Sequence, residues 1–299
     1  MNIMSKHWTT RRYAPVIVGT ALFLTSCANY PQQARMAAFG AAATDLSSAS
    51  KAAFTANVDI ARQRAEEEGL VAYLEKGPVF MPDYESMPVN STAQWGVRLR
   101  MIEAIGDYAE ALSKTGEPGA AEKAAASSKT LATSVAALSK AAGATAGPVV
   151  QAAPDLVAGF VRLGADAALS GRMRSVMIQT DPHIRQAVSL LKADFEVLAK
   201  TPQANTSGLT MARTDLLRDL RADRRNSSTA LVADYREVIS RERDAKAVAA
   251  AFDQMPDALQ KLADAHHALV TSTDSDRALA DFFAASDSIV AALSVLKTN

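Results

Sequence analysis

The sequence predicts an all-α protein, an elongated antiparallel bundle of about seven or eight helices that is partly coiled-coil-like. Two observations predict this fold class. The 299-residue chain is 48% hydrophobic but only 6% aromatic, and alanine supplies much of its apolar content. Apolar residues recur at spacings of three and four along most of the chain, whereas the alternation typical of strands is rare. No repeat of fixed period is visible, which argues against a solenoid.

Proline, glycine and capping residues mark the ends of the first predicted helices. The first helix begins just after Pro31 and ends at Lys76, before Gly77. The second opens at Ser91 with a capping-box pattern that Gln94 completes. The next boundaries are Gly116 with Pro118, the end of an alanine-rich run from Ala120 to about Ala142, and a break at 143–148, after which a helix runs to about Gln179.

Two further helix starts are predicted in the second half of the chain. Asp181 followed by Pro182 is typical of an N-cap and a first helical turn, so a helix is expected to begin there. The last amphipathic helix is expected to start at Thr273, with Asp276 three residues later as the second member of a capping box.

Apolar stripes along these helices predict which faces are buried. The stripe of the first helix ends at Leu74. In the last third of the chain, Tyr235 and Phe252 belong to a series at heptad spacing, which Pro256 interrupts and which resumes through His266. We therefore expect Tyr235 to face a neighbouring helix and His266 to be a hydrogen-bonded histidine of the core.

The first 26 residues have the pattern of an export signal. Lys6, Arg11 and Arg12 form a positively charged head, and the apolar run over 16–24 is too short to span a bilayer comfortably. Removing the signal takes away three of the 32 basic residues and none of the 32 acidic ones, which leaves a net charge of about −3. Nucleic-acid binding is not expected, because it needs a basic excess.

The run Leu24, Thr25, Ser26, Cys27 resembles the lipobox of bacterial lipoproteins. The resemblance implies that Cys27, the only cysteine, is lipidated (palmitate included) and becomes the first residue of the mature chain. An ordinary secretory signal with a coincidental cysteine, or a cysteine buried in a core helix, is the alternative.

This resemblance also implies an organisation and a location. Residues 1–26 would be the signal peptide, 27–32 the lipidated N-terminus with a short tether, and 33–299 the helical bundle domain. Because Ala28 rather than an aspartate follows the cysteine, the resemblance implies an outer-membrane lipoprotein that faces the periplasm, ahead of the inner membrane or the cell surface.

The segment 77–90 is the first candidate for partner binding. Its three prolines keep it extended, yet it carries apolar side chains that a solvated loop rarely has. Methionine and aromatic side chains can adapt to the surface of a protein partner. The alternative is that the segment folds back over the end of the bundle. The candidate partner-binding residues here are Phe80, Met81, Tyr84 and Met87.

Two other stretches allow a functional interpretation beside a structural one. In the arginine-rich stretch 213–225, Arg224 and Arg225 would meet an acidic partner, lipopolysaccharide phosphates or peptidoglycan carboxylates, unless the interleaved aspartates make it a solvated face. The segment 141–161 carries a single charge and is long enough to cross a bilayer, but its two prolines favour a tight helical hairpin.

No known catalytic or metal-binding pattern occurs in the sequence, so neither an enzyme nor a cofactor is expected and a small-molecule ligand is not favoured. Asp264 and His267 have a spacing that suits two metal ligands, but the sequence supplies no further members of a site.

The sequence therefore favours a membrane-anchored periplasmic scaffold or adaptor, whose partner is another protein of the cell envelope. The alternative is a membrane-active, pore-forming-like helical protein that inserts the segment 141–161.

Overall fold

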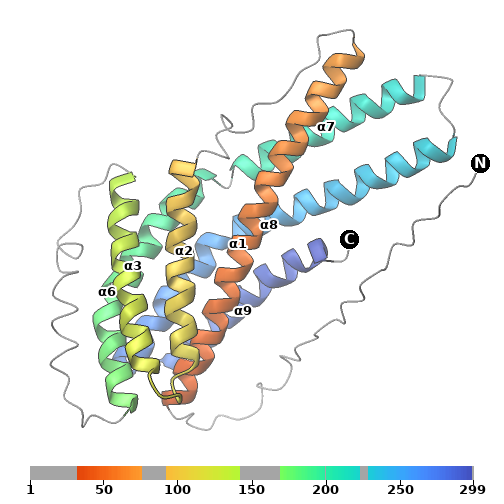
Figure 1. Cartoon of the computed structure of the whole chain (residues 1–299). Helices are drawn as coiled ribbons and strands as arrows, with labels where there is room; N and C mark the ends of the chain where they lie inside the picture. Colours follow the sequence, from red (N-terminus) through yellow and green to blue (C-terminus); the bar gives the residue numbers. More distant parts are fainter. Residues whose placement is uncertain (1–31, 76–91, 142–168, 199, 223–227, 298–299) are drawn as a thin grey trace, which may run out of the picture. The chain divides into compact units, whose positions relative to one another are not determined.

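Helices account for nearly all of the chain that the computed structural model describes, residues 32–75, 92–141, 169–198, 200–222 and 228–297. Seven α-helices and a short 3-10 turn lie in these ranges, which contain no strand. The helices pack against one another, so the predicted all-α bundle is confirmed (Figure 1). Their bounds are α1 Gln32–Leu74, α2 Thr92–Ser113, α3 Ala120–Ala141, α6 Leu169–Leu198, α7 Lys200–Ala222, α8 Ser228–Thr271, α9 Ser275–Ser294 and η2 Val295–Lys297.

The predicted boundaries of the first three helices agree with the structure to within about three residues, because proline and glycine stop helices whatever their tertiary surroundings. None of the described helices combines the length and the apolarity that crossing a membrane requires.

The two longest helices, α1 and α8, organise the others. The N-terminal half of α1 packs against α2, where the Ser47 hydroxyl donates to the carbonyl of Ile102 over 2.8 Å, and its C-terminal half packs against α7. α8 contacts α1, α6, α7 and α9 (Figure 1). α1 and α8 run antiparallel, since Phe39 near the start of α1 meets His266 near the end of α8, whereas Glu67 near the end of α1 meets Arg241 in the first half of α8.

Aromatic side chains fill the core between these long helices. Phe54 of α1 lies against Phe252 of α8, with ring centroids 5.1 Å apart. Nearer the start of α1, Phe39 contacts both His266 of α8 and Phe282 of α9, with centroids 5.6 and 5.5 Å away. Each of these side chains is at most 2% exposed. The histidine predicted to belong to the core therefore does.

α1 and α2 approach so closely at Gly40 that only a glycine fits. A Cβ atom at this position would lie 2.4 Å from the carbonyl oxygen of Ala109 and 2.4 Å from the amide nitrogen of Ser113. Both are backbone atoms, which cannot move away without shifting the helix. The contact sets the distance between the two helices, and with it the position of the side chains that α2 sends into the core.

The predicted N-cap at Asp181 is wrong, because α6 begins at Leu169 and continues through Pro182. Proline removes one helical hydrogen bond, the one to the carbonyl of Ile178, but its fixed φ angle is compatible with a helix. Val176 and Ile184, on the turns before and after the proline, are both buried, so packing holds the helix together across it. Asp181 consequently points from the middle of a helix into the core.

Pro256 does not interrupt α8 either, and the reason is the same: Met255 and Leu259 on either side of it are buried. The start of α9 was predicted to within two residues, but the capping box is absent. Asp274 occupies the N-cap position with a left-handed backbone (φ 45°) and its side chain makes no capping hydrogen bond.

Candidate functional site

The residues that the sequence singled out for lipidation and partner binding all lie outside the described residues. These are Leu24, Thr25, Ser26 and Cys27, the loop residues Phe80, Met81, Tyr84 and Met87, and the pair Arg224 and Arg225. The same holds for 142–161, all but the first residue of the candidate membrane segment. These predictions stay predictions.

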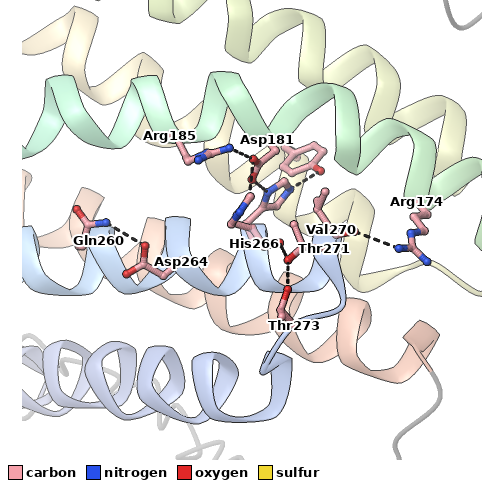
Figure 2. Close-up of polar contacts among 11 residues, drawn as sticks. Arg174, Asp181, Arg185, Gln260, Asp264, His266, Val270, Thr271 and Thr273 are labelled. Atoms are coloured by element: carbon pink, nitrogen blue, oxygen red, sulfur yellow. Dashed lines mark hydrogen bonds and ion pairs between the residues drawn. The ribbon is translucent and has the colours of Figure 1, made fainter.

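A chain of titratable side chains crosses the core between α2, α6 and α8. The Tyr108 hydroxyl lies 3.0 Å from Nε2 of His266, and Nδ1 of His266 lies 3.1 Å from Oδ1 of Asp181 (Figure 2). Tyr108, His266 and Asp181 are 1%, 0% and 3% exposed. Toward the surface, the second carboxylate oxygen of Asp181 meets Nδ1 of His267 at 3.0 Å and Nη2 of Arg185 at 2.7 Å.

Burial and hydrogen bonding set the protonation states in this network. Burial by itself would raise the pKa of Asp181, but hydrogen bonds from His266 and His267 and the charge of Arg185 outweigh it and lower that pKa to about 2. Burial lowers the pKa of His266 and raises that of Tyr108. Asp181 is thus charged while His266 and Tyr108 are neutral. Neutral His266 donates a hydrogen bond from Nδ1 to Asp181 and accepts one at Nε2 from the Tyr108 hydroxyl.

A hydroxyl pair connects this region to a fourth helix. Ser128 of α3 and Thr180 of α6 lie 2.8 Å apart and are both completely buried, and Thr180 also donates to the carbonyl of Val176. Together these contacts fix α2, α3, α6 and α8 in one relative register. A substrate could not reach Tyr108 or His266 without displacing packed helices, so the arrangement suits a structural role, in which these side chains hold the helices together.

Sequence reasoning found one member of this network and missed its partners. The prediction that His266 is a hydrogen-bonded core histidine is confirmed. Tyr108 and Asp181 are far from it in the sequence, so no spacing connects them. Asp264 and His267 do not converge, because Asp264 accepts from Gln260 while His267 faces Asp181. The described helices contain no cluster of three side chains that could hold a metal ion.

Farther along, where α1, α7 and α8 pack together, the interior is polar. Arg213 of α7 is 3% exposed and forms an ion pair with Glu67 of α1, and its Nη2 donates to Oε1 of Gln63 at 3.3 Å. Arg241 of α8 lies 3.7 Å from the same glutamate oxygen. Burial raises the pKa of Glu67, against the opposing charge of Arg213. Arg213, the first residue of the arginine-rich stretch, is thus buried rather than solvated.

Large apolar side chains are exposed at this end of α1 and α8. On α1, Leu70, Tyr73 and Leu74 are 43%, 53% and 43% exposed. On α8, Val232, Tyr235 and Ile239 are 50%, 57% and 48% exposed. Both sets have helical spacing, so each lies along one side of its helix. We call these six residues the apolar surface.

The two halves of the apolar surface lie at the same level of the helix pair. Glu67 contacts Arg241, and α1 and α8 are antiparallel, so the residues that follow Glu67 lie opposite those that precede Arg241. The predicted burial of Leu74 and Tyr235 is therefore wrong, because no described helix covers their stripes. Periodicity identifies an apolar face without telling what covers it.

Comparisons with protein-family models, with characterised proteins and with solved structures find no match to this chain.

Tyr108→Phe tests the buried hydrogen bond. The substitution keeps the ring but leaves Nε2 of His266 as a buried acceptor without a donor, which we expect to lower the free energy of unfolding by about 1–3 kcal/mol. Urea denaturation followed by circular dichroism measures it. The matched control is Tyr235→Phe, at an exposed position, where a change within about 0.5 kcal/mol is expected. Equal stabilities of the two variants would contradict the assigned bond.

The protonation state of His266 is a second expectation. We expect its ring to stay neutral, with the proton on Nδ1, while the folded protein is titrated from pH 8 to pH 5 and followed by ¹⁵N chemical shifts. The unfolded chain takes up a proton at this residue near pH 6.5, the ordinary value, whereas the folded one takes it up only at a lower pH, because burial lowers the pKa of His266. Its contribution to the free energy of unfolding therefore falls as the pH drops below 6.5. Titration of His266 at or above its ordinary pKa would refute the assignment.

Proposed function

We propose that this protein is an outer-membrane lipoprotein of the periplasm that acts as a scaffold or adaptor, and that its apolar surface binds an amphipathic helix of another envelope protein. The apolar surface is the observation that carries the proposal. Exposed apolar residues that cluster on neighbouring elements are typical of protein interaction sites, whereas single ones are scattered over most proteins. The lipid anchor rests on the lipobox resemblance described above.

The burial pattern of the two helices supports a missing helical neighbour. From Leu231 to Asp244 of α8 none of the described side chains is buried, and from Arg62 to Leu74 of α1 only Gly69 is. Two antiparallel helices with exposed apolar stripes at one level offer contact residues to an amphipathic helix. An amphipathic helix would bury the tyrosine rings and leave their hydroxyls at the rim, which is common at protein interfaces.

Charged residues beside the apolar surface would orient such a partner. Glu66 and Glu68 flank it on α1, and Arg236 and Glu237 flank it on α8; all four are exposed. A rim that contains both signs favours a helix with complementary charges on its borders over a strongly acidic or basic partner. It also gives the free protein a soluble border around its apolar residues.

The buried network of Tyr108, His266 and Asp181 also supports the scaffold proposal. Its titratable groups are hydrogen-bonded to one another and define the register of four helices. A scaffold needs such a rigid base, because a partner held by one part of the bundle must keep a defined position relative to the rest.

Photo-crosslinking in intact cells tests the apolar surface. A photoreactive residue at position 73 should give one dominant protein adduct, which Tyr235→Glu should abolish by placing a charge in the interface. Ile178→Glu is the matched control, because Ile178 is 50% exposed but lies on α6. Both variants should unfold within about 0.5 kcal/mol of the wild type, since the substituted side chains are exposed. Adducts to lipid alone, or an adduct that survives Tyr235→Glu, would argue against the adaptor.

The anchor is tested by Cys27→Ala. We expect this variant to move from the membrane fraction to the soluble periplasmic fraction with an unchanged helical circular dichroism spectrum, and to lose the adduct at position 73 if the partner is itself held at the membrane. Mass spectrometry of the wild type should find acyl chains on the cysteine. A wild-type protein whose Cys27 carries no acyl chain would overturn the lipoprotein assignment while leaving the apolar surface untouched.

A further inference from the structure

A groove of about 320 Å³ opens between α6 and α8, next to the surface end of the buried network. Arg185, Ser189 and Lys192 line it from α6, and Gln260 lines it from α8. Val188 and Ala263, both buried, lie at its base. Figure 2 shows the guanidinium of Arg185 pointing toward Asp181, and Gln260 on the neighbouring helix pointing toward Asp264.

We propose that this groove binds a phosphate group. Arg185, Ser189 and Lys192 are spaced at i, i+4 and i+7, so all three project from one side of α6. Among the lining residues whose side chains the structure describes, the two charged ones, Arg185 and Lys192, are both cations. An arginine fork, an ammonium group and a neighbouring hydroxyl are the donors that proteins combine to bind phosphate oxygens.

The support beneath Arg185 distinguishes this groove from a chance pair of surface cations. Nη2 of Arg185 donates to Asp181 over 2.7 Å, and the buried carboxylate of Asp181 is itself held by two histidines. The guanidinium is therefore fixed at the edge of the groove before any ligand arrives, which reduces the entropy lost on binding. Asp181 offsets the charge of Arg185, so Arg185 contributes fixed N–H donors and Lys192 contributes the positive charge that attracts the phosphate.

The hollow between α8 and α9 provides a contrast. Lys261 and Arg277 line it, but so do Asp264, Asp274 and Asp281. Lys261 is already paired with Asp257 at 2.7 Å. Carboxylates in the wall would repel a phosphate, so the positive charge there is not available to an anion. Of these two hollows, the groove between α6 and α8 has the charge that fits one.

The phosphate could be free in solution or part of a phospholipid headgroup. The shared chemistry is a tetrahedral anion small enough to lie between the two cations. The two sources are separated by the probe: inorganic phosphate for the first, and vesicles of phosphatidylglycerol compared with vesicles of phosphatidylcholine for the second.

The experiment uses the full chain carrying Cys27→Ser and follows the amide signals of Ser189 and Gln260 by NMR during titration with sodium phosphate at constant ionic strength. We expect a saturable shift in the wild type, and binding weakened about tenfold or more in Lys192→Gln, since one charged hydrogen bond contributes at least this much. Lys246→Gln, on α8 and paired with Glu242, is the matched control and should bind as the wild type does. Vesicle sedimentation of the same variants gives the second readout.

Each outcome decides the proposal. Binding of either probe that is lost in Lys192→Gln and retained in Lys246→Gln supports it, and the probe that binds names the source. Arg185→Gln should show the same loss, while Lys192→Gln remains informative if Arg185→Gln destabilises the network, because Lys192 lies outside it. Equal weakening by Lys192→Gln and Lys246→Gln would mean nonspecific attraction of anions and would overturn the proposal. So would the binding of neither probe.

Discussion

The hydrogen bond from neutral His266 to charged Asp181 is the contact on which the packing of this bundle depends. A carboxylate that is only 3% exposed is unfavourable unless its oxygens receive donors, and α8 supplies two of them from adjacent histidines. His266 can donate to Asp181 only while it stays neutral, and its other nitrogen then needs the hydroxyl of Tyr108 on α2. A shift of α8 by a single helical turn would take both histidine donors away from the buried carboxylate of Asp181 and leave it with Arg185 of its own helix alone. Apolar packing among alanine-rich helices tolerates such shifts far better, so the polar groups define the arrangement.

Two different interiors follow from the lengths of α1 and α8. Around the network, other helices surround these two, and aromatic residues such as Phe39, Phe54 and Phe252 fill the space between them. Where α1 and α8 continue beyond that part with α7, the interior contains the Glu67–Arg213 ion pair, and the apolar residues lie on the outside. An inside that is polar and an outside that is apolar is unusual for helices that pack alone. This combination agrees with the proposed partner helix.

The sequence predicted the fold class and the outer boundaries of α1, α2 and α3, since local residues such as Pro31 act directly on the backbone. The prediction from sequence failed at Asp181 and Pro182, because this dipeptide can either begin a helix or lie inside one. Here the buried side chains on the turns before and after the proline keep the helix continuous. Their burial depends on tertiary packing, which the local sequence does not reveal. For the site, His266 was recognisable from its place on an apolar stripe, but nothing in the sequence joins it to Tyr108 or Asp181. Tyr235 shows the complementary limit: its heptad position predicted that it faces a neighbouring helix, yet its side chain is 57% exposed, because spacing alone does not tell whether a described helix covers a stripe.

The length of α1 sets the distance between its first residues and its part of the apolar surface. Its first residues follow directly on the short stretch after Cys27, while Leu70, Tyr73 and Leu74 occupy its last turn and a half. At 1.5 Å per residue, the 43 residues of this helix separate its two ends by about 60 Å. In a protein anchored through its N-terminus, the length of α1 would thus set the distance between the anchor and the apolar surface. Insertions or deletions within α1 would move and rotate its exposed apolar residues relative to the rest of the bundle. Natural variants of this chain should therefore change α1 in length only by steps that preserve the helical phase.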